Sequence, residues 1–208
     1  MRNRLLFIIS GPSGVGKGTV ISAVLSHSPR LAKVITYTSR APREGEENHV
    51  TYHFISSEEF EEKIQQGFFF EWEKVYKDAY YGSPKNPFES MPDGYDALLE
   101  IGAGGMKDYL SSFREAITIF LAPPSMDALL DRIEKRGGGE TNLDNRLNSA
   151  IEMIREADHY DYVLVNDDLQ RTVNRIACII EVERHKAEGR EIARCLVNQA
   201  EEWMGKRS

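Results

Sequence analysis

The stretch GPSGVGKGT, residues 11–19, constrains the fold of this chain more than any other feature. It follows a short apolar run, Leu5–Ile9, and precedes a predicted helix over residues 17–27. A short, wholly apolar strand is typical of a buried parallel sheet. A glycine-rich turn between such a strand and a helix lets several backbone N–H groups point inward at the helix N-terminus. The stretch therefore predicts an α/β fold with a phosphate-binding loop.

The loop departs in one place from the usual phosphate-binding pattern, which is G-x-x-x-x-G-K followed by Ser or Thr. Gly11, Gly16 and Lys17 match it, but Gly18 stands at the hydroxyl position and Thr19 comes one residue later. Lys17 would bring a full positive charge to the β- and γ-phosphates of a nucleoside triphosphate. Thr19 would contact a phosphate. The alternative is a plain strand-to-helix turn with an exposed lysine.

The rest of the chain alternates between strand and helix patterns. Further strands are predicted at residues 34–38, 50–55, 68–76, 97–101, 116–121 and 161–166. Further helices are predicted at residues 56–67, 125–136, 143–157 and 168 to about 204, with a break near Gly189. Ser56 and Glu59 have the spacing of a capping box at the start of one helix. Strands that alternate with helices predict a parallel sheet with helices on both faces.

Composition limits what such a chain does. Its 208 residues suit one compact domain, and its 41% of hydrophobic residues supply a core. The formal net charge of -7 argues against a nonspecific nucleic-acid binder, which needs a basic face. Cys178 and Cys195 form no paired framework, which favours a reducing cytosol. Because the apolar runs are too short for a membrane span or a signal peptide, we expect a cytoplasmic protein without a membrane partner.

A pair of arginines stands in TYTSRAPREGEENHVTYHF, residues 36–54. Arg40 and Arg43 lie on either side of Pro42, and two guanidinium groups so close repel each other unless an anion lies between them. Such a pair suits a phosphate monoester, and Tyr52 offers a third contact to it. The alternative is a solvated basic turn.

A carboxylate stands within an apolar strand in FFFEWEKVYKDAYYGSP, residues 68–84. A carboxylate such as that of Glu71 is costly to bury unless it is paired. Guanine presents its N1–H and 2-amino group side by side, so one carboxylate accepts from both, whereas adenine has no such pair of donors. Tyr81 and Ser83 add hydroxyl groups nearby. The alternative is a strand glutamate that faces solvent.

Three arginines flank the glycine-rich stretch GGGETN. Arg132 and Arg136 are four residues apart on one predicted helix and share a face, and Arg146 follows the glycines. Converging arginines stabilise the charge that spreads over the oxygens in phosphoryl transfer. A lid that closes over the reacting groups also excludes water. The alternative is a set of ordinary surface arginines.

Taken in order, these stretches resemble the guanylate kinase family from Leu5 to about Lys186. The shared segments are GPSGVGKGT, TSRAPREGE…Y, EW…YYGS, FLAPPS, RIEKRG…RL and YDYVLVND, at near-family spacing. The resemblance implies a P-loop three-layer α/β/α fold with a central parallel sheet, a small mixed-β GMP-binding subdomain and a helical lid. It implies transfer of the ATP γ-phosphate to GMP or dGMP with Mg²⁺, in purine nucleotide metabolism.

The resemblance also implies the division of the chain and the roles of its residues. It implies one domain over residues 1–208, with a core at 1–34, 82–125 and 158–208, a GMP-binding part at about 35–81 and a lid at about 126–157. The implied catalytic residues are Lys17, Arg132, Arg136 and Arg146. The implied ATP-binding residues are Gly11, Pro12, Ser13, Gly14, Val15, Gly16, Lys17, Gly18, Thr19 and Asn166. The implied GMP-binding residues are Thr36, Arg40, Arg43, Tyr52, Glu71, Tyr81, Ser83 and Glu100. Mg²⁺ would be held mainly by the ATP phosphates and water.

The sequence departs from the family at LLEIGAGGMK, residues 98–107. Glu100 keeps the first acid of an acid-x-acid pattern, but Gly102 replaces the second. A lost charge-assisted hydrogen bond is worth about 1.5–3 kcal/mol, so this predicts a slow guanylate kinase. Two alternatives stay open: a ribose bisphosphate-type kinase on the same scaffold, and a guanylate-kinase-like binding protein with weak catalysis. The tail segment CLVNQAEEWM, residues 195–204, would pack on the body or on a second subunit, so both a monomer and a homodimer are open.

Overall fold

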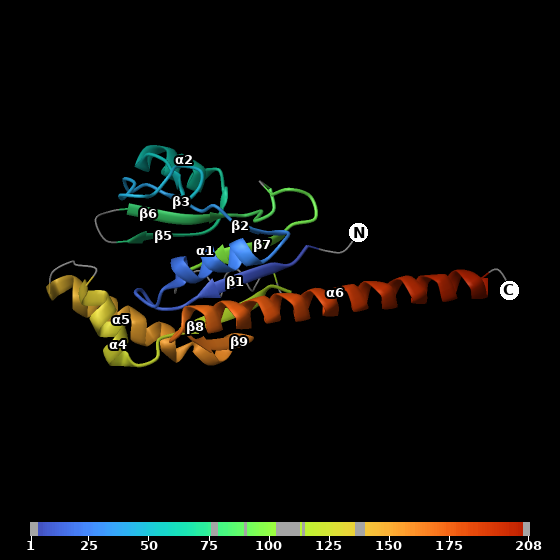
Figure 1. Cartoon of the computed structure of the whole chain (residues 1–208). Helices are drawn as coiled ribbons and strands as arrows, with labels where there is room; N and C mark the ends of the chain where they lie inside the picture. Colours follow the sequence, from blue (N-terminus) through green and yellow to red (C-terminus); the bar gives the residue numbers. More distant parts are fainter. Residues whose placement is uncertain are drawn as a thin grey trace.

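The computed structural model describes residues 4–75, 79–89, 91–102, 113, 115–135 and 140–205. A central sheet lies beside a smaller sheet, and a long helix extends away from both (Figure 1). Within the described residues the central sheet has five parallel strands in the order β2-β7-β1-β8-β9. They are β1 (Leu6–Ser10), β2 (Leu31–Lys33), β7 (Asp96–Glu100), β8 (Ile117–Ala122) and β9 (Tyr162–Val165). The predicted parallel sheet is confirmed.

The second sheet is mixed, as the resemblance implies. In the described part of the chain its order is β4-β3-β6-β5, with β3 and β4 parallel and the other neighbours antiparallel. Its strands are β3 (Tyr37–Thr38), β4 (His53–Phe54), β5 (Phe69–Val75) and β6 (Ala79–Pro84). Helix α2 (Ser57–Gln65) packs on this sheet through Phe60, whose ring stacks on Phe69 and Tyr80. The hydroxyl of Ser56 accepts from the backbone N–H of Glu59, so the predicted N-terminal cap is present.

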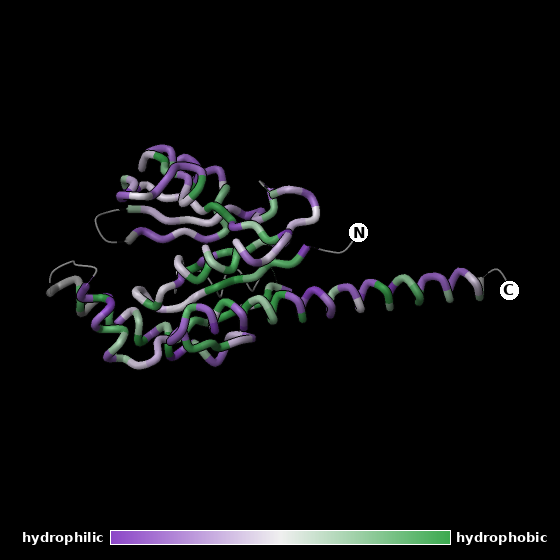
Figure 2. The backbone as a smooth tube through the Cα atoms, in the orientation of Figure 1, coloured by the Kyte–Doolittle hydropathy of each residue, from purple (hydrophilic) through white to green (hydrophobic). Residues whose placement is uncertain are grey.

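The core of the molecule lies on both faces of β1, whose residues are all buried. Phe7 and Ile9 belong to the cluster on the side of α1 (Lys17–His27) and α6 (Leu169–Gly205). Leu6 and Ile8 belong to a cluster on the opposite face, because successive side chains of a strand alternate. The backbone is accordingly hydrophobic along the central strands (Figure 2). The remaining helical elements are α4 (Met126–Lys135), α5 (Glu140–Arg155) and a short 3₁₀ turn (Ala157–His159).

The strand predicted at residues 34–38 is wrong in its extent, because the chain changes sheets there. The backbone N–H of Val34 still donates to Leu98 of the central sheet, whereas Tyr37 pairs with Gly82 of the second sheet. The strand predicted at 50–55 shrinks to the two residues of β4. Strand β6 was not expected, since Gly82 and the hydroxyl-rich AYYGSP segment weaken the strand pattern.

Helix α6 runs through the break predicted at Gly189 and continues to Gly205. A single glycine costs a helix about 1 kcal/mol, which a long helix tolerates. Its C-terminal half projects beyond the rest of the molecule (Figure 1) and exposes Ile192, Leu196 and Trp203. Residues 195–204 therefore lie away from the body of the domain in the described structure. None of the described helices has an uninterrupted apolar stretch that could cross a membrane.

A buried ion pair ties the base of α6 to the central sheet. Arg184 donates through Nε to Oδ2 of Asp96 at 2.8 Å, and the Asp96 side chain is fully buried. The other Asp96 oxygen, Oδ1, accepts from the backbone N–H of Leu5 at 2.9 Å. Arg184 also donates to the carbonyls of Pro29 and Arg30. One side chain of α6 thus joins the starts of β1 and β7 to the turn before β2.

Candidate functional site

The loop after β1 has the tight backbone that its glycines permit. Gly11 has φ +147°, and a Cβ there would lie 2.4 Å from the carbonyl oxygen of Leu121 on the neighbouring strand β8. Gly16 caps α1 in the left-handed conformation with φ 101°. Any side chain at position 11 would therefore push the loop off the sheet. At Gly18, by contrast, a Cβ would meet nothing within 4 Å, so the missing hydroxyl is a chemical difference and not a steric requirement.

Lys17 begins α1 and folds back over its own loop. Its Nζ donates to the carbonyl oxygen of Gly11 at 2.7 Å and lies 3.4 Å from that of Pro12. The ammonium group is thus held at the centre of the loop, where the inward-facing N–H groups and the start of α1 favour anions. Ser13, Gly18 and Thr19 are exposed at the rim.

Two side chains from distant elements meet at Val15. The amide of Asn166, which follows β9, donates to the Val15 carbonyl at 2.7 Å, and Arg132 of α4 donates to the same oxygen at 3.2 Å. A cavity of about 460 Å³ lies beside them and is also lined by Gly14, Gly16 and Asp167. Of the predicted ATP-binding residues, those that line this opening are Gly14, Val15, Gly16, Thr19 and Asn166.

Arg146 reaches the loop from the other helix of the predicted lid. From α5 it donates to Ser13 Oγ at 3.2 Å and to the carbonyl of Ile133 in α4 at 3.3 Å. Helices α4 and α5 pack on each other through Leu129, Ile133 and Ala150. This packing holds Arg132 and Arg146 on one side of the loop. Arg136, the third predicted lid arginine, lies outside the described residues.

An anion does lie beside the arginine pair, and it is a carboxylate of the same chain. Glu46 accepts two hydrogen bonds from Arg40, at 2.6 and 2.7 Å, and one from the backbone N–H of Arg43 at 2.8 Å. The hydrogen bond from Arg40 is the main cause of a lowered pKa of Glu46. Arg40 also donates to the hydroxyl of Tyr81 at 2.8 Å, and its guanidinium lies over the ring of Tyr52. Glu46 is the residue that sequence reasoning missed, although the acidic stretch EGEE directly follows Arg43.

Tyr52 links this group to the central sheet. Burial is the first cause of its raised pKa of about 12, and the negative charge of Glu100 is the second. Glu100 ends β7, at the carboxyl edge of the parallel strands, where ligands bind in open α/β sheets. The ammonium group of Lys33, which ends β2, lies 5.7 Å from the centre of the Tyr52 ring, so the second sheet meets this edge of the central sheet.

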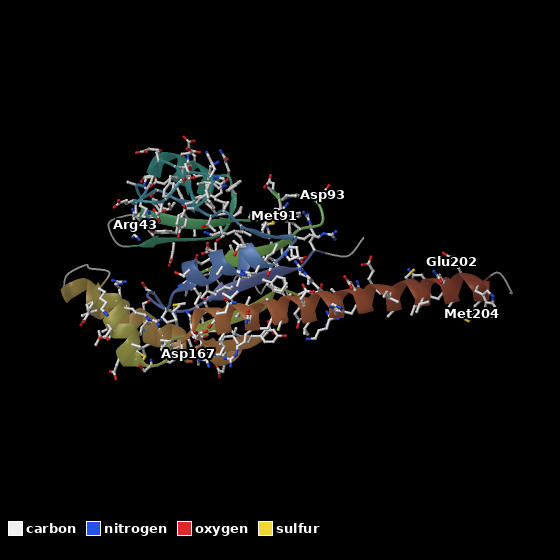
Figure 3. All side chains as sticks on the ribbon, viewed as in Figure 1. Arg43, Met91, Asp93, Asp167, Glu202 and Met204 are labelled. Carbon is white, nitrogen blue, oxygen red and sulfur yellow. The ribbon has the colours of Figure 1, made fainter. Side chains whose placement is uncertain are left out.

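Glu71 and Ser83 form the pair that the sequence predicts near a guanine. They are directly opposite on β5 and β6, and Ser83 Oγ donates to Glu71 Oε1 at 2.6 Å. Ser83 is 2% exposed, so its hydroxyl supports the Glu71 carboxylate from the buried side. Thr36 lies between β2 and β3, where its carbonyl accepts from the backbone N–H of His53. Arg43, in the loop between β3 and β4, and Asp167, beside the cavity, lie on the two sides of the candidate site (Figure 3).

Comparison with known proteins decides the family. Residues 3–183 match the family model described as guanylate kinase. The chain belongs to the guanylate kinase family. Among curated guanylate kinases, that of Caldanaerobacter subterraneus is 42% identical over 86% of this chain and 88% of its own length. The guanylate kinase of Clostridium tetani is 43% identical over 88% of each chain.

A solved guanylate kinase shares the fold as well. The crystal structure of guanylate kinase from Anaplasma phagocytophilum superposes with a TM-score of 0.72 at 31% identity, over 88% of this chain and 87% of that one. The matches favour a guanylate kinase over a ribose bisphosphate-type kinase. The segment that the family model leaves unmatched at the C-terminus, after residue 183, includes the projecting half of α6.

Proposed function

We propose that this protein transfers the γ-phosphate of ATP to GMP, and also to dGMP, to give GDP or dGDP with ADP. The observation that carries the proposal is the layout of the second sheet. The Glu71–Ser83 pair lies two residues along the strands from Tyr81, whose hydroxyl is bonded to Arg40. One face of one small sheet thus offers a carboxylate for a guanine edge and an arginine for a phosphate.

At the donor side, the loop residues 11–19 would hold the triphosphate through backbone N–H groups. Lys17 would exchange its carbonyl partners for the β- and γ-phosphate oxygens and follow the transferred group. Arg132 and Arg146 already lie against the loop and would stabilise the charge on the moving phosphoryl group. Asn166 would fix the loop beside the adenine end of the cavity.

Mg²⁺ is part of the proposal, and the local side chains suit a metal that arrives with ATP. Within the described residues, no three His, Cys, Asp or Glu side chains gather into a metal cage. Mg²⁺ commonly keeps several waters and binds substrate phosphates with the help of one or two carboxylates. The ATP phosphates and water would hold it, with Glu100 toward its water shell. When bound, Mg²⁺ neutralises charge on the β- and γ-phosphates.

At the acceptor side, Arg40, Arg43, Tyr52 and Tyr81 would bind the GMP phosphate. Arg40 is already oriented by Tyr81 and Glu46, so the phosphate finds a guanidinium in place. Glu71 would accept from N1–H and the 2-amino group of guanine, supported by Ser83, with Thr36 and Glu100 nearby. The reaction would serve purine nucleotide metabolism in the cytoplasm.

A coupled assay of ADP release tests the proposal. The protein is supplied with ATP, Mg²⁺ and, in separate reactions, GMP, dGMP, AMP, CMP, UMP and a ribose bisphosphate. We expect turnover with GMP and dGMP and none above background with the others. Turnover of the ribose bisphosphate alone, or of no acceptor at all, contradicts the proposal.

Replacement of Glu71 with glutamine tests the choice of base. Glutamine keeps the size but presents one donor and one acceptor, so one donor of guanine loses its partner. A buried polar mismatch costs about 1–3 kcal/mol, so the Kd for GMP should rise by roughly five- to 150-fold. Calorimetric titration with GMP and with ATP measures it, and the Kd for ATP should stay within about twofold. Equal losses for both nucleotides would indicate a folding defect, and no loss for GMP would remove Glu71 from the base site.

A further inference from the structure

The structure shows a neighbour for Gly102 that the sequence did not predict. A Cβ at Gly102 would lie 3.5 Å from Oε1 of Glu73, which is an ordinary van der Waals contact. Gly102 does not have a positive φ, so its backbone does not require glycine. The carboxylate that is absent from the end of β7 is therefore matched by one that reaches the same place from β5.

Glu73 lies on the same face of the second sheet as the predicted acceptor residues. It is directly opposite Tyr81, just as Glu71 is directly opposite Ser83. Directly opposite residues of antiparallel strands share a face, and so do residues two apart on one strand. The register is regular from Glu71 onward, so all four side chains project from one face.

The Glu73 carboxylate has no donor from the protein among the described residues. The residue as a whole is exposed, so water reaches the carboxylate on its open side. Partial burial raises the pKa of its carboxyl group. A partly desolvated carboxylate without a donor is stabilised when a ligand supplies one.

The position of Glu73 on the sheet selects which part of a nucleotide would meet it. The Glu71–Ser83 pair and the Glu73–Tyr81 pair are about 6.7 Å apart along the strands, close to the distance from a purine to its 5′-phosphate. Arg40 donates to Tyr81 from the edge of β6 that pairs with β3, whereas β5 pairs with the opposite edge of β6. The phosphate would bind beside Arg40, because the Glu73 carboxylate would repel it. The ribose, which connects the base to the phosphate, would then face Glu73.

We propose that Glu73 is a specificity-determining residue that accepts a hydrogen bond from the 2′-hydroxyl of the acceptor ribose. The inference rests on the proposed function, because it needs GMP in the acceptor site. Acidic side chains bind ribose 2′-hydroxyls in other nucleotide sites. Glu73 makes the protein bind GMP more tightly than dGMP, and it makes a second acid at position 102 unnecessary.

The test compares GMP with dGMP in calorimetric titrations without ATP. The wild type should bind GMP about ten- to a hundredfold more tightly than dGMP, because one charge-assisted hydrogen bond contributes about that factor to affinity. In Glu73→Ala the Kd for GMP should rise to that for dGMP, while the Kd for dGMP stays within about twofold. Glu73→Gln keeps a neutral acceptor, so its preference for GMP over dGMP should lie between those of the wild type and Glu73→Ala. Glu62→Gln, an exposed glutamate of α2, is the matched control and should leave both values unchanged.

A relocated carboxylate makes the test specific. Gly102→Asp alone places two carboxylates together and should not tighten GMP binding. Combined with Glu73→Ala, the same substitution should recover part of the preference for GMP, since its side chain begins beside the vacated place. An equal loss of GMP and dGMP affinity in Glu73→Ala, or an unchanged GMP preference, overturns the inference. Failure of the proposed function is a separate result, in which wild type does not phosphorylate GMP at all.

Discussion

Replacement of Lys17 with alanine is expected to lower kcat/KM for phosphoryl transfer to GMP by at least about a hundredfold. The ammonium group is the full charge at the centre of the loop, and it would follow the γ-phosphate during transfer. Such an electrostatic contact is worth roughly 3 kcal/mol in the transition state. The coupled ADP-release assay at saturating Mg²⁺ measures the change.

The fold should survive this substitution, because the Lys17 side chain is only partly buried and its hydrogen bonds to Gly11 and Pro12 stay within the loop. The melting temperature should therefore stay close to that of the wild type. Lys186→Ala is the matched control, since this lysine is exposed on α6 and pairs with Glu183 on the same helix. A Lys17→Ala enzyme with wild-type kcat/KM would show that the loop does not bind the triphosphate.

Replacement of Asp96 with asparagine is expected to lower the free energy of unfolding by about 3 kcal/mol. Asparagine removes the buried anion of the Arg184 guanidinium, and a buried charge that loses its buried partner is strongly unfavourable. Since Arg184 joins α6 to the starts of two central strands, the loss should affect cooperative unfolding of the whole sheet. Urea unfolding followed by circular dichroism measures the shift in midpoint at an unchanged m-value.

Glu181→Gln provides the comparison for Asp96→Asn. Glu181 also pairs with Arg184, but its side chain is 58% exposed. An exposed pair contributes about 0–1 kcal/mol, so this variant should unfold within that margin of wild type. Equal midpoints for the two variants would mean that burial of Asp96 does not set the strength of the pair.

The parts of the fold that the sequence predicts well are those whose signals are local. The apolar run of β1, the glycines after it and the helix pattern of α1 are continuous in sequence, and the structure places them within a residue of prediction. The stretch 34–38 was misassigned because one strand-like pattern is divided between two sheets. Which sheet a strand joins depends on residues 60 positions away, such as Leu98, and no local periodicity records it.

The candidate site likewise contains residues that the sequence indicates and residues that only the structure reveals. The sequence points to Arg40, Arg43 and Glu71 because a charge in an unusual place needs an explanation. It does not point to Glu46, an ordinary loop acid whose role arises only when the turn brings it under Arg40. Glu73 is also inconspicuous in sequence, since its importance depends on the approach of β5 to the end of β7. The absence of an acid at position 102 is visible in the sequence, whereas the Glu73 carboxylate beside that position is visible only in the structure.

In the acceptor site proposed above, the pairing of Arg40 with Glu46 would make phosphate binding an exchange of one anion for another. An incoming phosphate does not meet a bare cation surrounded by loosely held solution ions, because an internal carboxylate already occupies two of the guanidinium donors. The phosphate has to compete with that carboxylate, and singly charged anions such as chloride or acetate are poor competitors. A doubly charged phosphate monoester offers the larger gain. In the proposed acceptor site, Glu46 would thereby hold Arg40 in its orientation and disfavour the binding of small singly charged anions.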